Sequence, residues 1–261
     1  LGDVYKRQEY KKFKKESQKE VSYLVKEFEC KKAAGAYSRA SVSRTGVLDT
    51  TKLQNYKFSE DLFKKVTILP DGKNHGLIFV LDWSGSMSTV IEDTLKQLYS
   101  LIWFCKKVQI PFEVYAFTYE WHRARNRELY TYDRDDREDK KFHCDRKENE
   151  FHIDPDFNLL NFFSSKNNSK DLEHQMLNIW RTAHSFRYRT NYHYPHAMSL
   201  SGTPLNESLV SLYKIIPQFQ KDNGVEKVQC IILTDGEADT LPYNKNVQRN
   251  WEDEEFLGTR R

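Results

Sequence analysis

Residues 77–87, which read Leu-Ile-Phe-Val-Leu-Asp-Trp-Ser-Gly-Ser-Met, decide the fold of this chain. The first five are apolar, and three of those five are β-branched or aromatic. Such a run is typical of a strand buried on both faces of a parallel sheet. Asp82, Ser84 and Ser86 follow this run, and Gly85 supplies the backbone freedom of a tight turn. The turn can therefore direct one carboxylate and two hydroxyls at a common point.

This oxygen-rich turn has two interpretations. Mg²⁺ prefers oxygen ligands in octahedral geometry, so the turn suits a hard divalent cation better than a softer metal. Alternatively, a Ser or Asp ahead of an amphipathic run caps the free N–H groups at the start of a helix. The turn alone leaves both interpretations open.

Two later segments favour the cation. Residues 201–205 read Ser-Gly-Thr-Pro-Leu and place the Thr203 hydroxyl in a loop ahead of a helix-like run. Residues 231–236 read Ile-Ile-Leu-Thr-Asp-Gly, a second buried-strand pattern that ends in a carboxylate. In a doubly wound sheet, the carboxyl ends of neighbouring strands meet in one crevice. We therefore expect five side chains to share one cation: Asp82, Ser84, Ser86, Thr203 and Asp235.

The order of these residues resembles the von Willebrand factor A (vWA) family, whose metal-ion-dependent adhesion site is Asp-x-Ser-x-Ser, then a distant Thr and a distant Asp. The resemblance implies an α/β fold with a Rossmann-like, doubly wound and mostly parallel sheet. It also implies a bound Mg²⁺, or Mn²⁺ in its place. In that family an acidic residue of a partner protein fills a free position on the cation. The implied function is cation-dependent docking, without catalysis by this chain alone.

A second motif narrows the resemblance. Residues 46–53 read Gly-Val-Leu-Asp-Thr-Thr-Lys-Leu, shortly upstream of the strand that carries the proposed site. This element is similar to one in the T subunit of aerobic cobalt chelatase, and related proteins are carried by large tailed phages. The similarity implies an AAA+ ATPase as partner, and a large chelatase subunit as a further one. An ordinary linker on the domain edge is the alternative, and a role in cobalamin synthesis or in a phage process stays open.

Trp83 departs from the small or polar residue often found between the Asp and the first Ser of the vWA site. As a large ring beside the site it is a candidate partner contact, because Trp is favoured at interaction hot spots. Packing beneath the loop is the alternative interpretation. The sequence does not decide between them.

Composition limits the class of protein. The 261 residues are 30% charged, with mean hydropathy −0.79, and contain no apolar run near the ~18 residues that a membrane span needs. The net charge of +3, from 41 basic and 38 acidic residues, does not argue for a nucleic-acid partner. Four cysteines without CxxC spacing indicate neither a disulfide framework nor a zinc knuckle. Without a visible signal peptide, we expect a cytoplasmic location in a bacterium or a phage-infected host.

We divide the chain into three parts. Residues 1–8 resemble the translation of a transposon adaptor used in sequencing libraries, and we exclude them from fold reasoning. Residues 9–74 hold a helix from Glu9 to about Ala34, ended by Gly35, and then a polar region. Residues 75–261 form the vWA domain, with an insertion at about 119–200. We expect a truncated C-terminus, because a complete A domain needs a further strand and helix.

Hydrophobic periodicity predicts the elements of that domain. Helices are expected over 88–108, 171–186 and 205–219, and strands over 111–118 and 228–234. The first helix carries a stripe of Ile91, Leu95, Leu98 and Ile102. The last helix is expected to bury one side, made of Leu209, Leu212, Tyr213 and Ile216.

Two other functions are open. A metal-dependent hydrolase, a peptidase or nuclease, would draw on the eight histidines, of which His143 with Cys144 and His193 with His196 are the nearest to ligand pairs. No His-Glu-x-x-His spacing is present. Nucleic-acid binding would use residues 186–194, which read Phe-Arg-Tyr-Arg-Thr-Asn-Tyr-His-Tyr and could stack bases between phosphate contacts. The same composition suits a polar protein interface.

Overall fold

The computed structural model describes residues 2–39, 41–48, 63–68, 74–120, 150–151, 153, 156–190, 193–236, 238–241, 243–248 and 255–260. Part of the Gly46–Leu53 motif and the His143–Cys144 pair lie outside these ranges. Among the helices within them, none is both long enough and apolar enough to cross a membrane.

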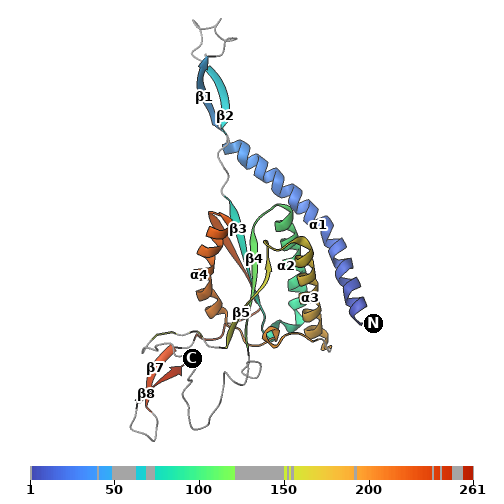
Figure 1. Ribbon diagram of the computed structural model, residues 1–261, viewed down its shortest axis with the longest axis vertical. Helices are drawn as coiled ribbons and strands as arrows, with labels where there is room; N and C mark the ends of the chain where they lie inside the picture. The colour runs from blue at the N-terminus through green and yellow to red at the C-terminus, as the bar shows by residue number, and fades with distance from the viewer. Residues whose placement is uncertain are drawn as a thin grey trace.

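A four-stranded sheet forms the centre of the molecule, with strand order β5-β4-β3-β6. Its strands are β3 (His75–Asp82), β4 (Phe112–Tyr119), β5 (Phe157–Ser164) and β6 (Lys227–Leu233). The central strand β3 runs parallel to β4 and to β6, whereas β5 pairs antiparallel with β4 at the edge. Figure 1 shows the sheet between helices on both of its faces. The expected α/β class with a mostly parallel sheet is confirmed.

The apolar run that decided the fold is buried on both faces, as predicted. Phe79 and Leu81 of β3 belong to a large core cluster on one face of the sheet, and Ile78 and Val80 belong to a second cluster on the other face. All four side chains are fully buried. A strand covered on both sides needs no polar alternation, which explains its continuous apolar sequence.

Helices α2 (Ile91–Lys107) and α3 (Ser169–Tyr188) cover one face, and α4 (Leu205–Asn223) covers the other (Figure 1). Short 3₁₀ helices lie at Ser86–Thr89 and His196–Met198. The predicted stripe of α2 is confirmed, because all of its members are fully buried in the large cluster: Ile91, Leu95, Leu98 and Ile102.

The N-terminal helix α1 (Gly2–Arg39) is longer than predicted. It includes most of the adaptor-like residues, and it continues through Gly35, so the expected helix end at Gly35 is wrong. A single Gly inside a helix costs only about 1 kcal/mol relative to Ala, which the Lys- and Glu-rich sequence around it tolerates. Tyr10 and Val21 anchor the helix in the large core cluster, where the Phe13 ring stacks on Trp180 with centroids 5.4 Å apart.

The segment expected as an insertion, at about 119–200, contains elements of the central layers. Residues 157–188 supply the edge strand β5 and the helix α3, so they are part of the central layers. The strand was not recognised because its polar and apolar residues do not alternate regularly. The pairing with β4 shifts between Val114 and Tyr115, whose partners are Phe163 and Asn161, and leaves Phe162 as an extra residue. Such a bulge breaks the period of two on which strand recognition depends.

Helix α4 turns only part of the predicted side to the sheet, because Leu212 and Ile216 pack in the second core cluster whereas Leu209 and Tyr213 are exposed. Leu212 is buried at 5% exposure and packs with Phe219, but Leu209 is 42% exposed and Tyr213 is 84% exposed. The apolar residues of α4 extend around more than one side of the helix, so spacing alone did not identify the buried side.

Two further pairs of strands were not predicted. Strands β1 (Ser41–Leu48) and β2 (Phe63–Ile68) form one antiparallel sheet, and β7 (Tyr243–Gln248) and β8 (Glu255–Arg260) form another. Each pair is a sheet of its own, separate from the four central strands.

Two Leu→Ala substitutions test this packing. Leu95→Ala removes a fully buried side chain of α2, and we expect the free energy of unfolding to fall by about 2–5 kcal/mol. Leu209→Ala removes the same atoms from the exposed side of α4, and we expect a loss below about 1 kcal/mol. Urea unfolding followed by circular dichroism measures both values. Equal losses for the two variants would contradict the orientation of α4.

Candidate metal centre

The first predicted ligand, Asp82, ends the central strand β3 and is fully buried. Its Oδ1 accepts a hydrogen bond from the backbone N–H of Ser84 at 2.9 Å. Its Oδ2 accepts one from the hydroxyl of Thr234 at 2.6 Å, across from the end of the neighbouring strand β6. These two bonds fix the carboxylate between the turn after β3 and the turn after β6.

A chain of hydrogen bonds joins three further predicted oxygens. The hydroxyls of Ser84 and Ser86 are 3.0 Å apart, and the Ser86 hydroxyl donates to Asp235 Oδ1, also at 3.0 Å. Ser86 and Asp235 are 149 residues apart in the sequence. The parallel pairing of β3 with β6 brings their turns together at one edge of the sheet.

The spacing of these oxygens fits an octahedral cation. Neighbouring ligands around Mg²⁺, with Mg–O bonds of about 2.0–2.1 Å, lie about 2.9 Å apart. The two separations of 3.0 Å between Ser84 Oγ, Ser86 Oγ and Asp235 Oδ1 are close to that value, and they are also the length of ordinary hydrogen bonds. The donor set is also of the right chemical kind, because carboxylates and hydroxyls are the oxygen ligands that hard cations prefer.

The loop of Thr203 joins the same edge through its backbone. Ser201 forms an isolated parallel bridge with Ser84, and the Ser201 carbonyl accepts a hydrogen bond from the Gly85 N–H at 2.7 Å. Thr203 follows two residues later. Its hydroxyl takes no part in the chain of hydrogen bonds that connects the other four predicted ligands. The structure thus joins Asp82, Ser84, Ser86 and Asp235 directly and brings the Thr203 loop alongside.

The electrostatics of the site favour a cation. Burial raises the pKa of the Asp82 carboxyl, and the negative charge of Asp235 raises it further. The hydrogen bonds from Thr234 and Ser84 oppose this effect but do not cancel it. None of the ion pairs found among the described residues provides Asp82 or Asp235 with a Lys or Arg partner. A divalent cation would offset the repulsion between the two carboxylates.

The structure decides between the two interpretations of Trp83. The side chain is fully buried, and its indole N–H donates to the Met198 carbonyl at 2.7 Å. The ring packs edge-on against Phe162 and Phe186, with centroid distances of 4.9 and 5.8 Å. The expected partner contact at Trp83 is therefore wrong, because no part of the ring reaches the surface. The ring instead packs beneath the turn that carries Ser84 and Ser86.

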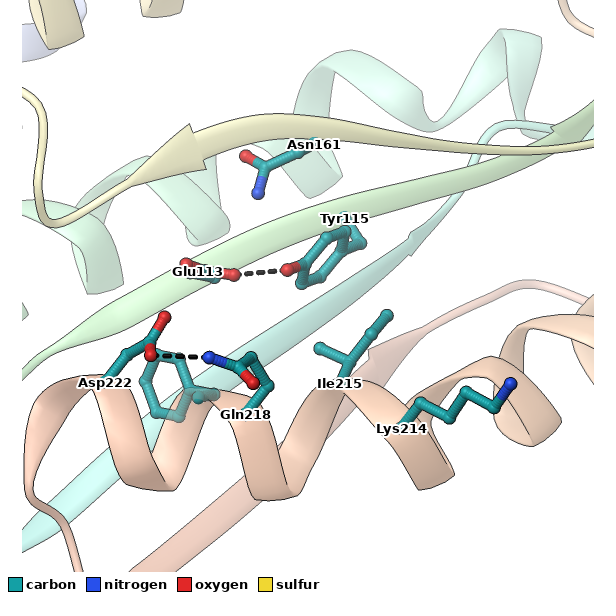
Figure 2. Close-up of a pocket in the computed structure, with 8 residues that line it drawn as sticks. Glu113, Tyr115, Asn161, Lys214, Ile215, Gln218 and Asp222 are labelled. Atoms are coloured by element: carbon teal, nitrogen blue, oxygen red, sulfur yellow. Dashed lines mark hydrogen bonds between the residues drawn. The ribbon is translucent and has the colours of Figure 1, made fainter.

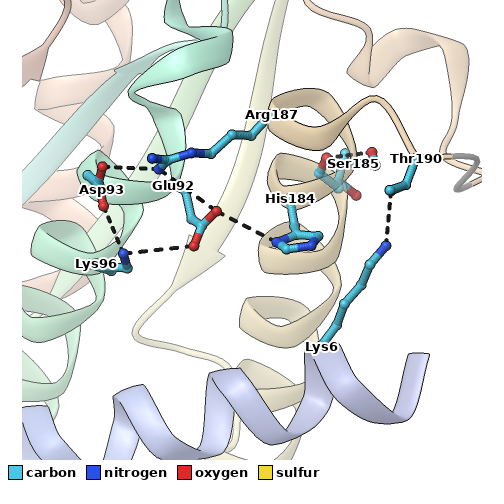
Figure 3. A network of polar contacts seen from close by, with 9 residues as sticks. Lys6, Glu92, Asp93, Lys96, His184, Ser185, Arg187 and Thr190 are labelled. Atoms are coloured by element: carbon cyan, nitrogen blue, oxygen red, sulfur yellow. Dashed lines mark hydrogen bonds and ion pairs between the residues drawn. The ribbon is translucent and has the colours of Figure 1, made fainter. Parts of the chain in front are cut away.

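A polar cluster connects the helices beside this turn. Figure 3 shows Arg187 and His184 of α3 directed toward Glu92 of α2. Arg187 donates to Asp93 at 3.1 Å, and Lys96 pairs with Asp93 at 2.7 Å. Since Glu92 and Asp93 lie in the first turn of α2, these contacts hold the beginning of that helix, just after the turn of Ser84 and Ser86.

A cavity of about 350 Å³ lies away from this edge, between the sheet and α4. Figure 2 shows Glu113 and Tyr115 of β4 opposite Gln218 and Asp222 of α4. Tyr115 donates to Glu113, and Gln218 donates to Asp222 at 2.6 Å. Glu113 belongs to the amino-terminal part of β4, and Asp222 to the end of α4. The cavity therefore lies toward the opposite end of the strands from Asp82.

Sequence reasoning missed two hydroxyl residues at the site, Thr234 and Ser201. Thr234 was treated as the last residue of a strand, although a hydroxyl directly before Asp235 is a usable signal. The Ser201 hydroxyl oxygen is buried without a hydrogen-bond partner among the described residues. In the same residues, no group of three or more His, Cys, Asp or Glu side chains is placed to hold a metal, so His193 and His196 are not gathered into such a group.

No protein-family model, curated protein or solved structure matches this chain.

The raised pKa of Asp82 gives a prediction about pH. A carboxyl whose pKa is higher in the folded than in the unfolded state stabilises the fold at low pH and loses that contribution as the pH rises through the folded pKa. In EDTA at pH 7 we therefore expect Asp82→Asn to have a higher Tm than the unsubstituted protein. The difference should shrink as the pH falls toward the ordinary range of an Asp carboxyl.

Asp222→Asn is the matched control, because the hydrogen bond from Lys166 lowers the pKa of Asp222. Asp222→Asn should change the stability in the opposite direction. The ionised Asp222 carboxylate stabilises the fold at pH 7, and this stabilisation is lost in acid. Thermal unfolding from pH 4 to pH 8 measures both variants. A lower Tm for Asp82→Asn at pH 7 in EDTA would contradict the charge repulsion inferred at the site.

Proposed function

We propose that this chain is a vWA-type docking module, in which a bound Mg²⁺ accepts an acidic residue of a partner protein. The observation that carries the proposal is the hydrogen-bonded chain from Ser84 through Ser86 to Asp235, which brings three of the proposed ligand oxygens together. The central sheet supports it, because β3 lies between two parallel neighbours and an antiparallel strand pairs with β4. The assignment to the vWA family is part of the proposal.

The chemistry of the proposed ligands explains the need for an external acid. Asp82 and Asp235 supply the negative charge, whereas Ser84, Ser86 and Thr203 supply neutral hydroxyls. Mg²⁺ held mainly through neutral oxygens keeps residual positive charge. That charge attracts a carboxylate from outside, since Mg²⁺ binds oxygen ligands in octahedral geometry. Docking of this kind needs no nucleophile and no general base.

The proposed partners follow from the resemblance of residues 46–53 to the cobalt chelatase T subunit. They are an AAA+ ATPase and, where the complex makes cobalamin, a large chelatase subunit. In this proposal the chain is a non-catalytic subunit that connects the ATPase to its target. No observation at the site specifically favours a metal-dependent hydrolase or a nucleic-acid-binding protein.

Ser86→Ala tests metal binding at the proposed site. The substitution removes the hydroxyl that links Ser84 to Asp235, and because Ser86 is exposed it leaves the packing of the core unchanged. We expect Mg²⁺ affinity to fall by at least about tenfold in isothermal titration calorimetry, which corresponds to about 1.4 kcal/mol. Ser100→Ala is the matched control, since the Ser100 hydroxyl bonds the Lys96 carbonyl within α2. Equal affinity in both variants would refute the site.

Asp82→Ala tests the docking step. We expect a cobalt-chelatase-type AAA+ ATPase to be retained by the unsubstituted protein in Mg²⁺ and released in EDTA. The Asp82→Ala variant should retain little ATPase in either buffer, because its cation site lacks a carboxylate. Binding that is equal with and without Mg²⁺, or equal for the two proteins, would overturn the proposal.

A further inference from the structure

The Thr203 loop needs an external support, because residues 202–204 belong to no helix or strand. Ser201, directly before these residues, is held by the hydrogen bond that its carbonyl accepts from the Gly85 N–H. The Thr203 carbonyl accepts a hydrogen bond from the Leu205 N–H at 2.8 Å, and further contacts to Thr203 come from a different part of the chain.

Asp239 holds both backbone polar groups of Thr203. Its Oδ2 accepts a hydrogen bond from the Thr203 N–H at 2.8 Å. Its own N–H donates to the Thr203 carbonyl at 2.9 Å. A third bond fixes Asp239 in turn, since the Asn206 side chain in the first turn of α4 donates to the Asp239 carbonyl at 2.9 Å. Asp239 thereby ties the loop to the start of the helix that follows it.

Gly202 permits this close contact. A Cβ atom at position 202 would lie 2.6 Å from Cδ2 of Tyr119 and 2.7 Å from Oδ2 of Asp239, closer than such atoms approach. The loop is thus confined between the Tyr119 ring and the Asp239 carboxylate. The Tyr119 hydroxyl also donates to the buried Glu207 at 3.1 Å, which connects the end of β4 to the first turn of α4.

We infer that Asp239 is a positioning residue of the metal centre, which holds Thr203 in place for the cation without binding the cation itself. The inference rests on the proposed function, and it adds a residue that the motif does not contain. The three hydrogen bonds of Asp239 run to the Thr203 loop and to the start of α4, and among the described residues none of them runs to the other proposed ligands. Asp239 also follows Asp235 by four residues, so one loop supplies both a ligand and the support of a second ligand.

Three variants separate this role from a simple effect of charge. Asp239→Ala removes the acceptor for the Thr203 N–H, and we expect Mg²⁺ affinity to fall by about 10- to 100-fold, as for other residues that orient metal ligands. Asp239→Asn loses the charge but keeps a side-chain carbonyl as acceptor, and we expect affinity within about threefold of the unsubstituted protein. Asn206→Ala removes only the bond to the Asp239 carbonyl, and we expect a loss below about tenfold.

A double-mutant cycle tests whether Asp239 acts through Thr203. Thr203→Ala removes the hydroxyl but keeps the backbone N–H that Asp239 binds. If Asp239 serves to position that hydroxyl, adding Asp239→Ala to Thr203→Ala causes little further loss of Mg²⁺ affinity. Isothermal titration with Mg²⁺ gives the affinities, Mn²⁺ electron paramagnetic resonance gives a second readout, and Tm in EDTA reports folding.

The outcomes distinguish this inference from the proposed function. Failure of the unsubstituted protein to bind Mg²⁺ or Mn²⁺ would refute the metal centre and with it this role. Normal binding by the unsubstituted protein, with equal binding by Asp239→Ala, would refute the positioning role alone. Additive losses in the cycle, or equal losses for Asp239→Asn and Asp239→Ala, would also overturn it. If Asp239→Ala does not fold, unchanged affinity in Asn206→Ala refutes the role, and a measurable loss of up to about tenfold supports it.

Discussion

The buried carboxylate of Asp82 is the constraint on which the arrangement of the site depends. It lies at the end of the central strand with no exposed surface, and it accepts hydrogen bonds from the turns that follow β3 and β6. A buried carboxylate is costly unless its oxygens find donors. The Ser84 N–H and the Thr234 hydroxyl meet that need only if both turns approach the same point. The requirements of one side chain therefore fix the relative position of two loops.

Aromatic packing between the sheet and its helices supports the backbone of these turns. The Trp83 ring packs beneath the turn of Ser84 and Ser86 and connects it to the edge strand β5 and to α3 through Phe162 and Phe186. On the far side of α2 and α3, the N-terminal helix adds Tyr10 and Phe13 to an aromatic cluster around Trp180. Close packing of large rings leaves little freedom for the backbone that carries them. The hydroxyls of the turn are consequently held by a rigid base.

The errors made from the sequence have a common cause. Three predictions each required knowing which element covers a residue. They concern the exposure of Trp83, the presence of the edge strand β5 and the buried side of α4. A large ring next to a polar turn has the same sequence whether it faces solvent or the underside of a loop. A bulged strand such as β5 loses the alternation that identifies strands. The α4 helix carries apolar residues around much of its circumference, so the contact with the sheet selects which of them are buried.

The sequence by itself determined the features that arise from local periodicity and local chemistry. These are the doubly buried strand, the stripe of α2, and the alternation of Asp82, Ser84 and Ser86 in a turn that opens toward a helix. Only the tertiary structure decided that Ser86 bonds Asp235, and that Asp239 holds the backbone of Thr203. The physical reason is that periodicity indicates that a segment has a covered face, but it does not identify the element that covers it. Contacts between distant turns follow from the pairing order of the strands, and no local pattern specifies that order.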